Sequence, residues 1–431
     1  MKVYEKVYEY YVNQIKASAL KPGDRMPSMR ESEKILNVSR TSIETAYLQL
    51  AADGYIYSVE KVGYFVSETV ARVLMEDSGK VSSNKSNSFK KYQYDLATIG
   101  EDKSISCLQL WRRYMKSALR QEDRLLSYAS NQGELELREE IAVHVRKTRN
   151  IICTPEDIVI GAGFQNLLQI LIALIPGVRT ISFPTRDFAD GAFTFENAGF
   201  QVSYRNKDCH VIYVAPSYMN KWGEVMTMKR RHEIIEHVIR NSHLLIEDDY
   251  QNDFVYSSRP TPSLYAMTGG ENTAFLGSFS RVLLPSVRIS YLILPRGTRE
   301  KYNQIKDLYN QTASKAEQIA LAQFIRDGHL NRHIKKIHRH YGEKRQIMLE
   351  ALREYFSAEN LLVGDSGMEI GLRLNIKSAK TEFEKEKLFV NVIEEAEDYN
   401  ILLLSCSLIS MEDIKIAIKR VYDIYNKCFV C

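Results

Sequence analysis

One stretch of this chain cannot contribute to a folded core, and it divides the sequence into two parts. Residues 76–91 (EDSGKVSSNKSNSFKK) are rich in Ser, Asn and Lys and contain almost no large apolar side chain. Such a segment cannot bury enough apolar surface to offset the entropy lost on ordering, so we expect a flexible linker. The predicted domains of the 431-residue chain are a unit at 1–68, a linker at 69–93 and a larger unit at 94–431, with a large part (94–325) and a C-terminal small part (326–431).

Composition excludes several classes of protein. Hydrophobic residues make up 45% and charged residues 26%, the balance of a soluble globular protein. No apolar run approaches the length of a membrane-spanning helix, and the N-terminus lacks the apolar segment of a signal peptide, so we expect a cytoplasmic protein with no membrane partner. Cys428 and Cys431 have the spacing of a metal or redox pair, but no second pair accompanies them, and we predict no metal site.

The N-terminal unit has the pattern of three short helices followed by two strands. Apolar residues at helical spacing predict a first helix with one buried stripe. Ser28 and Glu31 have the spacing of a capping box, which predicts a helix from Ser28 to residue 35 or 36. A third helix is expected over 39–50, and strands over 54–58 and 63–66. Two short helices joined by a tight turn are typical of a helix-turn-helix. The residues of the first stripe are Tyr4, Val7, Tyr8, Tyr11 and Ile15.

Several short motifs follow one another along this unit: 20–25 (LKPGDR), Pro27, Ser28, Arg30, 38–41 (VSRT), Ala46, Tyr47, Leu50 and 54–56 (GYI). Their order resembles the winged helix of the GntR family of bacterial transcription regulators. The resemblance implies that Arg30, Ser39, Arg40 and Thr41 face double-stranded operator DNA, and that Lys61 in the wing contacts its backbone. An arginine offers a two-pronged fork to guanine or phosphate, and hydroxyls at a helix N-terminus add donors. The alternative is that the two arginines are ordinary surface charges. Residues 1–68 carry nine Lys and Arg against nine Asp and Glu, so net charge does not favour DNA.

The larger unit alternates short apolar strands with amphipathic helices. This alternation predicts an α/β domain with a mostly parallel sheet flanked by helices, and a smaller α+β C-terminal part. Three polar segments are expected at strand ends: 161–163 (GAG) before an apolar helix, 248–250 (DDY), and 277–281 (GSFSR), followed by Arg288. Ligands of α/β sheets bind beyond the carboxyl ends of strands, and a helix N-terminus favours an anion.

These segments resemble the cofactor site of fold-type I pyridoxal-phosphate enzymes of the aspartate-aminotransferase type. The resemblance implies a phosphate site at Gly163, Ser278, Ser280 and Arg288. It also implies that Asp248 pairs with the pyridinium nitrogen, that Tyr250 reaches the phenolic oxygen, and that Arg281 stands where the Schiff-base lysine belongs. Residues predicted to bind the cofactor are thus Gly163, Asp248, Tyr250, Ser278, Ser280, Arg281 and Arg288.

Arginine at position 281 argues against catalysis. A guanidinium stays protonated at any working pH and cannot attack the cofactor aldehyde as a lysine amine does, so we predict no catalytic residue. Other positions depart from the family pattern in the same direction: Phe164 replaces a small or hydroxylic residue, and only Phe188 is placed to stack on the ring. The small part offers only Arg373, a poor candidate, for a substrate carboxylate.

A winged helix joined to an aminotransferase-like domain resembles the MocR subfamily, over residues 2 to about 355. The resemblance implies a homodimeric transcription regulator whose catalytically inactive domain binds pyridoxal phosphate, or its amino-acid adduct, without covalent attachment. In one alternative the pocket binds nothing and the domain only dimerises. In a second, the protein is a pyridoxal-phosphate-dependent aminotransferase with an appended DNA-binding domain. In a third, it is a non-regulatory DNA-associated protein.

Overall fold

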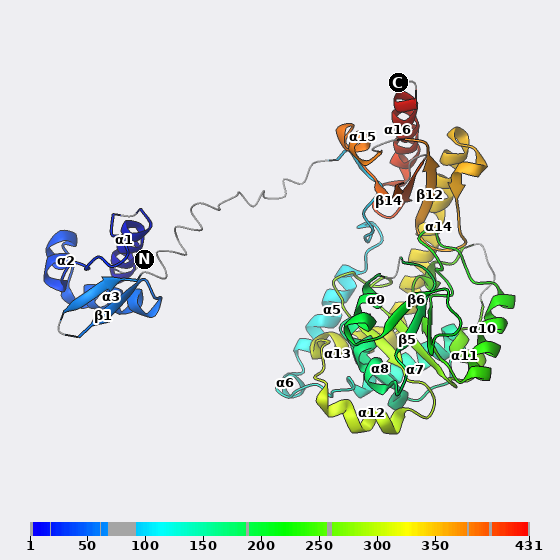
Figure 1. Ribbon diagram of the computed structural model, residues 1–431, viewed down its shortest axis with the longest axis horizontal. Coiled ribbons are helices and arrows are strands. Elements are labelled where there is room, and N and C mark those ends of the chain that lie inside the picture. Colours follow the sequence, from blue (N-terminus) through cyan, green and yellow to red (C-terminus); the bar gives the residue numbers. More distant parts are fainter. Residues whose placement is uncertain are drawn as a thin grey trace. The chain divides into compact units, whose positions relative to one another are not determined.

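The computed structural model forms two compact units, Met1–Lys91 and Tyr92–Cys431 (Figure 1). It describes residues 3–17, 19–60, 62–67, 92–186, 189–256, 261–376, 379–395 and 399–429. The predicted linker falls almost wholly on residues 68–91, which lie outside the described residues, as do Lys61, Phe188 and Cys431. No helix of the described part of the chain is long and apolar enough to cross a membrane.

The N-terminal unit contains the predicted three helices and two strands. Ser28 caps the second helix with both hydrogen bonds of a capping box, and Asn37 ends that helix in a left-handed conformation with φ 51°. The two strands pair antiparallel, with Ile56 opposite Val66 and Val59 opposite Gly63. The elements are α1 (Val3–Lys16), α2 (Met29–Leu36), α3 (Arg40–Ala52), β1 (Ile56–Val59) and β2 (Gly63–Val66).

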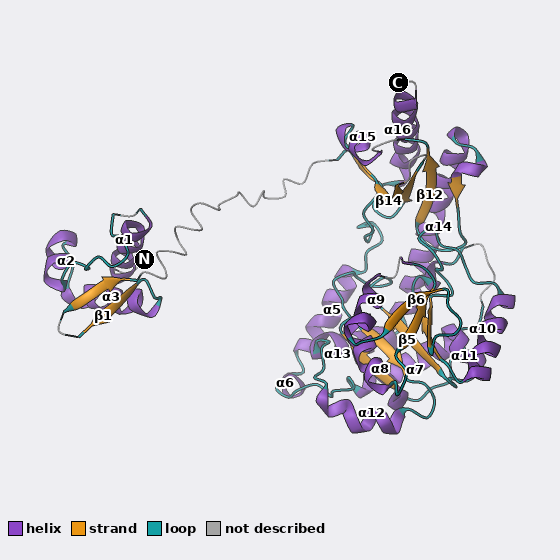
Figure 2. Cartoon of the chain, in the orientation of Figure 1, coloured by secondary structure: helices purple, strands orange, loops and turns teal. Residues whose placement is uncertain are grey.

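The large part of the second unit is built on a seven-stranded sheet in the order β4-β10-β9-β8-β7-β5-β6. Figure 2 shows strands of this sheet in orange, surrounded by helices in purple. Strands β9, β8, β7, β5 and β6 run parallel, and β10 is antiparallel to both of its neighbours, so the sheet is mostly parallel as predicted. The strands are β4 (Ile158–Gly161), β5 (Thr180–Phe183), β6 (Gln201–Tyr204), β7 (Val211–Val214), β8 (Leu244–Asp248), β9 (Thr273–Ser278) and β10 (Ser290–Ile293).

Helices cover both faces of this sheet because successive strand residues point to opposite sides. Ile181, Val211 and Tyr213 pack into one core with α8 and α9, whereas Ile212 and Val214 pack into another with α10. The helices of the large part are α5 (Leu108–Leu119), α6 (Glu122–Leu125), α7 (Leu135–Arg149), α8 (Phe164–Leu174), α9 (Ala189–Asn197), α10 (Met228–Asn241), α11 (Leu264–Thr268), α12 (Arg299–Ile305) and α13 (Lys315–Arg326).

The small part has its own four-stranded sheet in the order β11-β12-β15-β14, against which long helices pack. The short strand β3, near the start of the unit, pairs in parallel with β13 of the small part. The beginning and the end of the second unit are therefore joined. The remaining elements are β3 (Tyr94–Asp95), α14 (His329–Tyr355), β11 (Leu361–Leu362), β12 (Glu369–Leu374), α15 (Ala379–Lys385), β13 (Leu388–Phe389), β14 (Asn391–Glu395), β15 (Asn400–Ser405) and α16 (Met411–Phe429).

Candidate functional site

The side chains predicted to face DNA are exposed at the N-terminal ends of α2 and α3. Arg30, Ser39, Arg40 and Thr41 are all solvent-exposed. Ser39 is the N-cap of α3, but its hydroxyl shares a hydrogen bond with the hydroxyl of Ser42 (3.0 Å) and makes none to the backbone. The Ser39 side chain therefore does not cap α3, and the amide of Ser42 donates instead to the carbonyl of Ser39 (3.0 Å). The amides of Arg40 and Thr41, which precede it, are placed where a helix N-terminus can donate to a phosphate.

A buried chain of hydroxyl groups fixes the three helices of the N-terminal unit. The Ser32 hydroxyl lies 2.7 Å from that of Tyr11 on α1 and 2.9 Å from that of Tyr47 on α3. Tyr47 donates to the carbonyl of Pro27 (2.7 Å), just before α2 begins. No sequence pattern singled out Ser32, because its two partners lie in other helices.

Arg25 links the helical part of the unit to the wing, which consists of β1, β2 and the loop between them. Its guanidinium donates to the carbonyl of Val62, and it lies so close to Gly63 that a Cβ there would meet Nε at 3.4 Å. The sequence placed Arg25 in a family motif but gave no role for it.

Two of the residues predicted to bind phosphate, Gly163 and Arg288, meet at the start of α8. Gly163 has φ 99°, a conformation that favours glycine, and it caps the helix without a side-chain hydrogen bond. A Cβ at Gly163 would meet a terminal nitrogen of Arg288 at 3.2 Å, so this guanidinium lies against the helix N-terminus. Free amides, the helix dipole and a guanidinium together suit a phosphate dianion.

The two serines of the predicted phosphate site have different hydrogen-bond partners. Ser278 accepts from the hydroxyl of Ser290 (3.1 Å) and from the amide of Ser280 (3.4 Å), which leaves its own proton free to donate outward. The hydroxyl of Ser280 donates to the carbonyl of Val287 (2.8 Å). Ser278 can therefore donate to a phosphate, whereas Ser280 holds the loop between β9 and β10.

Asp248, the predicted partner of the pyridinium nitrogen, lies at the end of β8. Its carboxylate accepts from the hydroxyl of Tyr213 on β7 and from the amide of Tyr250 (3.1 Å). Burial raises the pKa of Asp248 to about 6, and the two hydrogen bonds oppose that rise. The next residue, Asp249, points the other way and binds Arg149 Nε at 2.7 Å. Tyr213 was not predicted from the sequence, although its place on the neighbouring buried strand could have suggested it.

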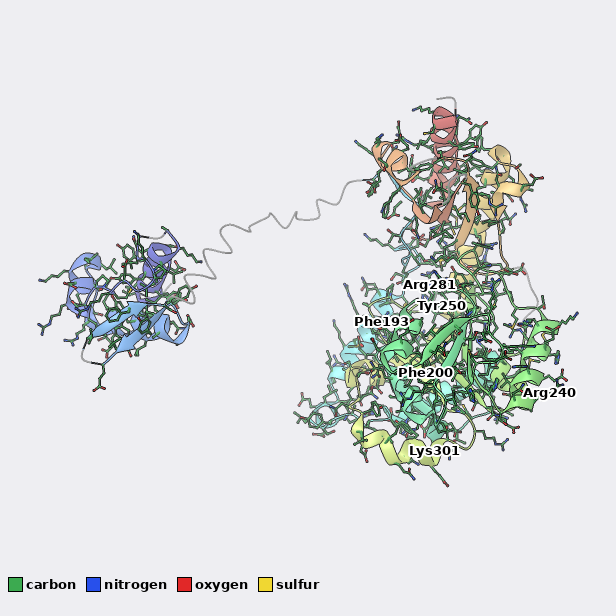
Figure 3. All side chains as sticks on the ribbon, in the orientation of Figure 1. Phe193, Phe200, Arg240, Tyr250, Arg281 and Lys301 are labelled. Carbon is green, nitrogen blue, oxygen red and sulfur yellow. The ribbon has the colours of Figure 1, made fainter. Side chains whose placement is uncertain are left out.

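Tyr250 lies at the same edge as Arg281, at the junction of the large and small parts (Figure 3). Its ring packs edge-on against Tyr218, with 5.2 Å between the ring centroids. Burial raises the pKa of the Tyr250 hydroxyl, while the nearby guanidinium of Arg281 lowers it.

Arg281 pairs with a buried acid from the small part. Its terminal nitrogen lies 3.5 Å from Glu369 Oε1, and Glu369 is only 1% exposed. The guanidinium also lies over the ring of Phe254, 6.0 Å from its centroid, and its Nε has no hydrogen-bond partner among the described residues. The second oxygen of Glu369 accepts from the amide of Met368 (2.9 Å). Glu369 was not predicted from the sequence; it begins β12, the strand that also carries Arg373.

A nearby cluster has ligand atoms at metal-like distances. Within the described part of the chain, Glu101, Cys107 and His333 bring theirs within 4.8 Å of one another. Burial raises the pKa of the Cys107 thiol to about 12, and the thiol donates to the carbonyl of Leu283. The positive charge of Lys336 lowers the pKa of both Glu101 and His333. A protonated thiol and a neighbouring ammonium disfavour a cation, so we assign no metal to this cluster.

Comparison with known proteins agrees with this architecture. The family model described as "Bacterial regulatory proteins, gntR family" matches residues 3–66. The HTH-type transcriptional regulator YhdI of Bacillus subtilis (strain 168), itself uncharacterized, is 33% identical over 402 residues, which cover 88% of this chain and 85% of that protein. The pyridoxine biosynthesis regulator PdxR of Corynebacterium glutamicum is 28% identical over 345 residues, covering 77% of this chain and 75% of that protein. The chain belongs to the GntR family of regulators and fits its MocR subfamily.

The regulator's second unit has the fold of aminotransferases. An archaeal alanine:glyoxylate aminotransferase matches it with a TM-score of 0.68 at 23% identity, covering 77% of this chain and 90% of that one. A kynurenine aminotransferase from Pyrococcus horikoshii matches with a TM-score of 0.67 at 20% identity, covering 88% and 99%. The protein is a DNA-binding transcription regulator with an aminotransferase-like unit.

Proposed function

We propose that the aminotransferase-like unit of this regulator is catalytically inactive and binds pyridoxal phosphate, or its amino-acid adduct, without a covalent bond. The observation that carries the proposal is the pairing of Arg281 with the buried carboxylate of Glu369 at 3.5 Å. When bound, the cofactor supplies an aldehyde that reacts with amines, and position 281 offers only a guanidinium, which is not a nucleophile at working pH.

The remaining groups fit a non-covalent ligand. Gly163, Ser278 and Arg288 would hold the phosphate, since together they provide free amides, one outward hydroxyl proton and a positive charge. Asp248 would orient the pyridinium nitrogen, and Tyr250 the phenolic oxygen. Ser280 and Arg281 would act indirectly, by holding the loop and the contact between the two parts.

We further propose that the regulator works as a cytoplasmic homodimer on double-stranded operator DNA. Arg30, Ser39, Arg40 and Thr41 would contact DNA through exposed groups at helix ends, and Lys61 of the wing would contact its backbone. A ligand in the pocket would change operator affinity only if it bound one arrangement of the dimer more tightly than the other.

Ligand binding is tested with purified full-length protein and pyridoxal phosphate. We expect saturable binding by fluorescence titration, and no increase in protein mass after borohydride treatment. Arg288→Gln should weaken binding about tenfold or more, because one charge-assisted contact is lost. The control Arg296→Gln removes an exposed arginine that lies outside the proposed phosphate site, and should bind normally. A borohydride-fixed adduct on any lysine of the pocket would refute catalytic inactivity.

DNA binding is tested on the upstream region of the regulator's own gene. Arg40→Ala should abolish sequence-specific binding and leave the circular dichroism spectrum unchanged. Lys6→Ala, which removes an exposed charge on α1, serves as the control. Unchanged affinity in Arg40→Ala would mean that α3 does not read DNA, and uniform binding to unrelated DNA would favour a non-regulatory role. Sedimentation velocity of the same samples tests the dimer.

A further inference from the structure

The connection between β6 and β7 is unusually short for its path. Strand β6 is at the edge of the sheet, and β5 lies between it and β7, so residues 205–210 must cross over β5. Crossovers between parallel strands usually take a dozen or more residues and contain a helix. Here an irregular segment, which we call the strap (residues 205–210), makes the crossing. The carbonyl of Lys207 lies 2.7 Å from His237 Nε2, so the strap passes on the α10 face of the sheet.

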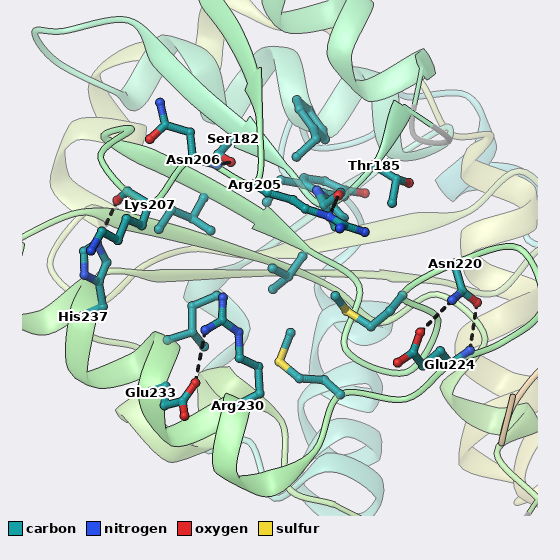
Figure 4. A pocket seen from close by; sticks show the side chains of 18 of the residues that line it. Ser182, Thr185, Arg205, Asn206, Lys207, Asn220, Glu224, Arg230, Glu233 and His237 are labelled. Carbon is teal, nitrogen blue, oxygen red and sulfur yellow. Dashed lines mark hydrogen bonds and ion pairs between the residues drawn. The ribbon is translucent and has the colours of Figure 1, made fainter.

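The strap is tied closely to β5. The amide of Arg205 donates to the carbonyl of Phe183 (2.9 Å), and the amide of Asn206 donates to the hydroxyl of Ser182 (2.9 Å). Because a strap covers less surface than a helix, a cavity of about 570 Å³ remains between it, strands β5 and β7, and α10 (Figure 4). Known small-molecule sites have volumes of roughly 300–1,000 Å³.

The inner wall of this cavity is apolar. It is formed by Ile212 and Val214 of β7 and by Met226 and Ile234 at α10, all of which are buried. Gly163, Arg288 and Asp248 do not line it, and α8 packs on the opposite face of the sheet. The cavity therefore adjoins the proposed cofactor site through Tyr213, which lines the cavity and whose hydroxyl donates to Asp248, but it contains none of the proposed cofactor ligands.

The rim of the cavity carries unpaired positive charge. Arg205 donates through Nε to the carbonyl of Pro184 (3.1 Å), and its terminal nitrogens have no partner in the described part of the chain. Its φ of 53° is uncommon for a residue other than glycine, and its side chain extends toward Thr185 (Figure 4). The ammonium of Lys207 also has no partner among the described residues.

The two acidic residues on the rim, Glu224 and Glu233, already have a hydrogen-bond or ion-pair partner. Glu233 pairs with Arg230 at 3.1 Å, and Glu224 accepts from the side chain of Asn220 at 2.8 Å. We propose that this cavity binds a small organic acid whose apolar body packs on β7 and α10 and whose anionic group contacts Arg205 and Lys207. This second ligand site goes beyond the proposed function.

The probe for this site is 8-anilinonaphthalene-1-sulfonate, an anion with an apolar body, whose fluorescence rises when it leaves water. We expect one saturable site in the full-length protein. Arg205→Gln combined with Lys207→Gln should weaken binding about tenfold or more, since charge-assisted contacts are lost. The neutral N-phenyl-1-naphthylamine should bind both proteins equally. The matched control combines Arg240→Gln with Lys301→Gln, which removes two exposed charges elsewhere and should leave affinity within about twofold (Figure 3).

A second variant tests the same cavity by filling it. Val225 lines the cavity and is half-buried, so Val225→Trp should abolish probe binding and leave circular dichroism unchanged. The proposal would be overturned if the probe bound equally well to the unaltered protein, to the double-glutamine variant and to Val225→Trp. It would also be overturned if binding fell in Arg288→Gln instead, because the probe would then occupy the proposed phosphate site.

Discussion

The ion pair between Arg281 and Glu369 should contribute strongly to the stability of the aminotransferase-like unit. The pair joins the loop after β9 in the large part to β12 in the small part, and its side chains are 19% and 1% exposed. We consider Arg281→Met, Glu369→Gln and the double variant. Glu369→Gln retains a carbonyl oxygen that can accept from the amide of Met368.

The magnitude follows from the separation and the burial of the pair. At 3.5 Å, Coulomb's law with an effective dielectric constant of about 20 gives about 5 kcal/mol. Partial exposure of the guanidinium reduces this, so we expect a coupling free energy of about 2–3 kcal/mol. Arg281→Met should lower the free energy of unfolding by about 3–5 kcal/mol, because it strands a buried carboxylate. The double variant should lose less than the sum of the two single variants.

Urea unfolding at neutral pH, followed by tryptophan fluorescence, measures these free energies. The two tryptophans of the chain, Trp111 and Trp222, both belong to the second unit, so the signal reports that unit alone. The exposed pair of Arg240 and Glu236 provides a control cycle, for which we expect about 0.3–0.5 kcal/mol. A coupling between Arg281 and Glu369 no larger than that of the control would refute the reasoning.

Three further predictions concern chemistry, pH and the N-terminal unit. Arg281→Lys alone should capture pyridoxal phosphate covalently only to a small extent, because the carboxylate of Glu369 favours the protonated form of the new amine. Adding Glu369→Gln removes that charge and should increase the amount of borohydride-fixed adduct, measured by mass, severalfold. Burial raises the pKa of Asp248 to about 6, so its negative charge is present above that pH and lost below it. The affinity for pyridoxal phosphate, measured by fluorescence titration, should therefore fall more between pH 8 and pH 5 in the unaltered protein than in Asp248→Asn; parallel curves would contradict this role. Ser32→Ala removes the hydroxyl between two buried tyrosines and should lower the free energy of unfolding of the first unit by about 1–3 kcal/mol. Hydrogen exchange of the amides of residues 3–66 measures this change. Unchanged exchange would show that the first unit does not depend on the chain of hydroxyl groups for its stability.

Features that depend on neighbouring residues were predictable from the sequence. The capping box at Ser28, the alternation of strands and helices, and the glycine turn before α8 all follow from a few consecutive side chains. The chemistry of Arg281 was also evident, since a guanidinium resists deprotonation in any surroundings.

Features that depend on contacts between distant segments required the tertiary structure. Glu369 lies 88 positions from Arg281, and Tyr213 lies 35 positions from Asp248. The cavity under the strap exists because the order of strands forces a short segment across β5. The sequence thus determined which charged and polar groups the regulator possesses and which local structures carry them. Only the packing of β12 against the loop after β9, and of β7 beside β8, decided which of those groups pair with each other.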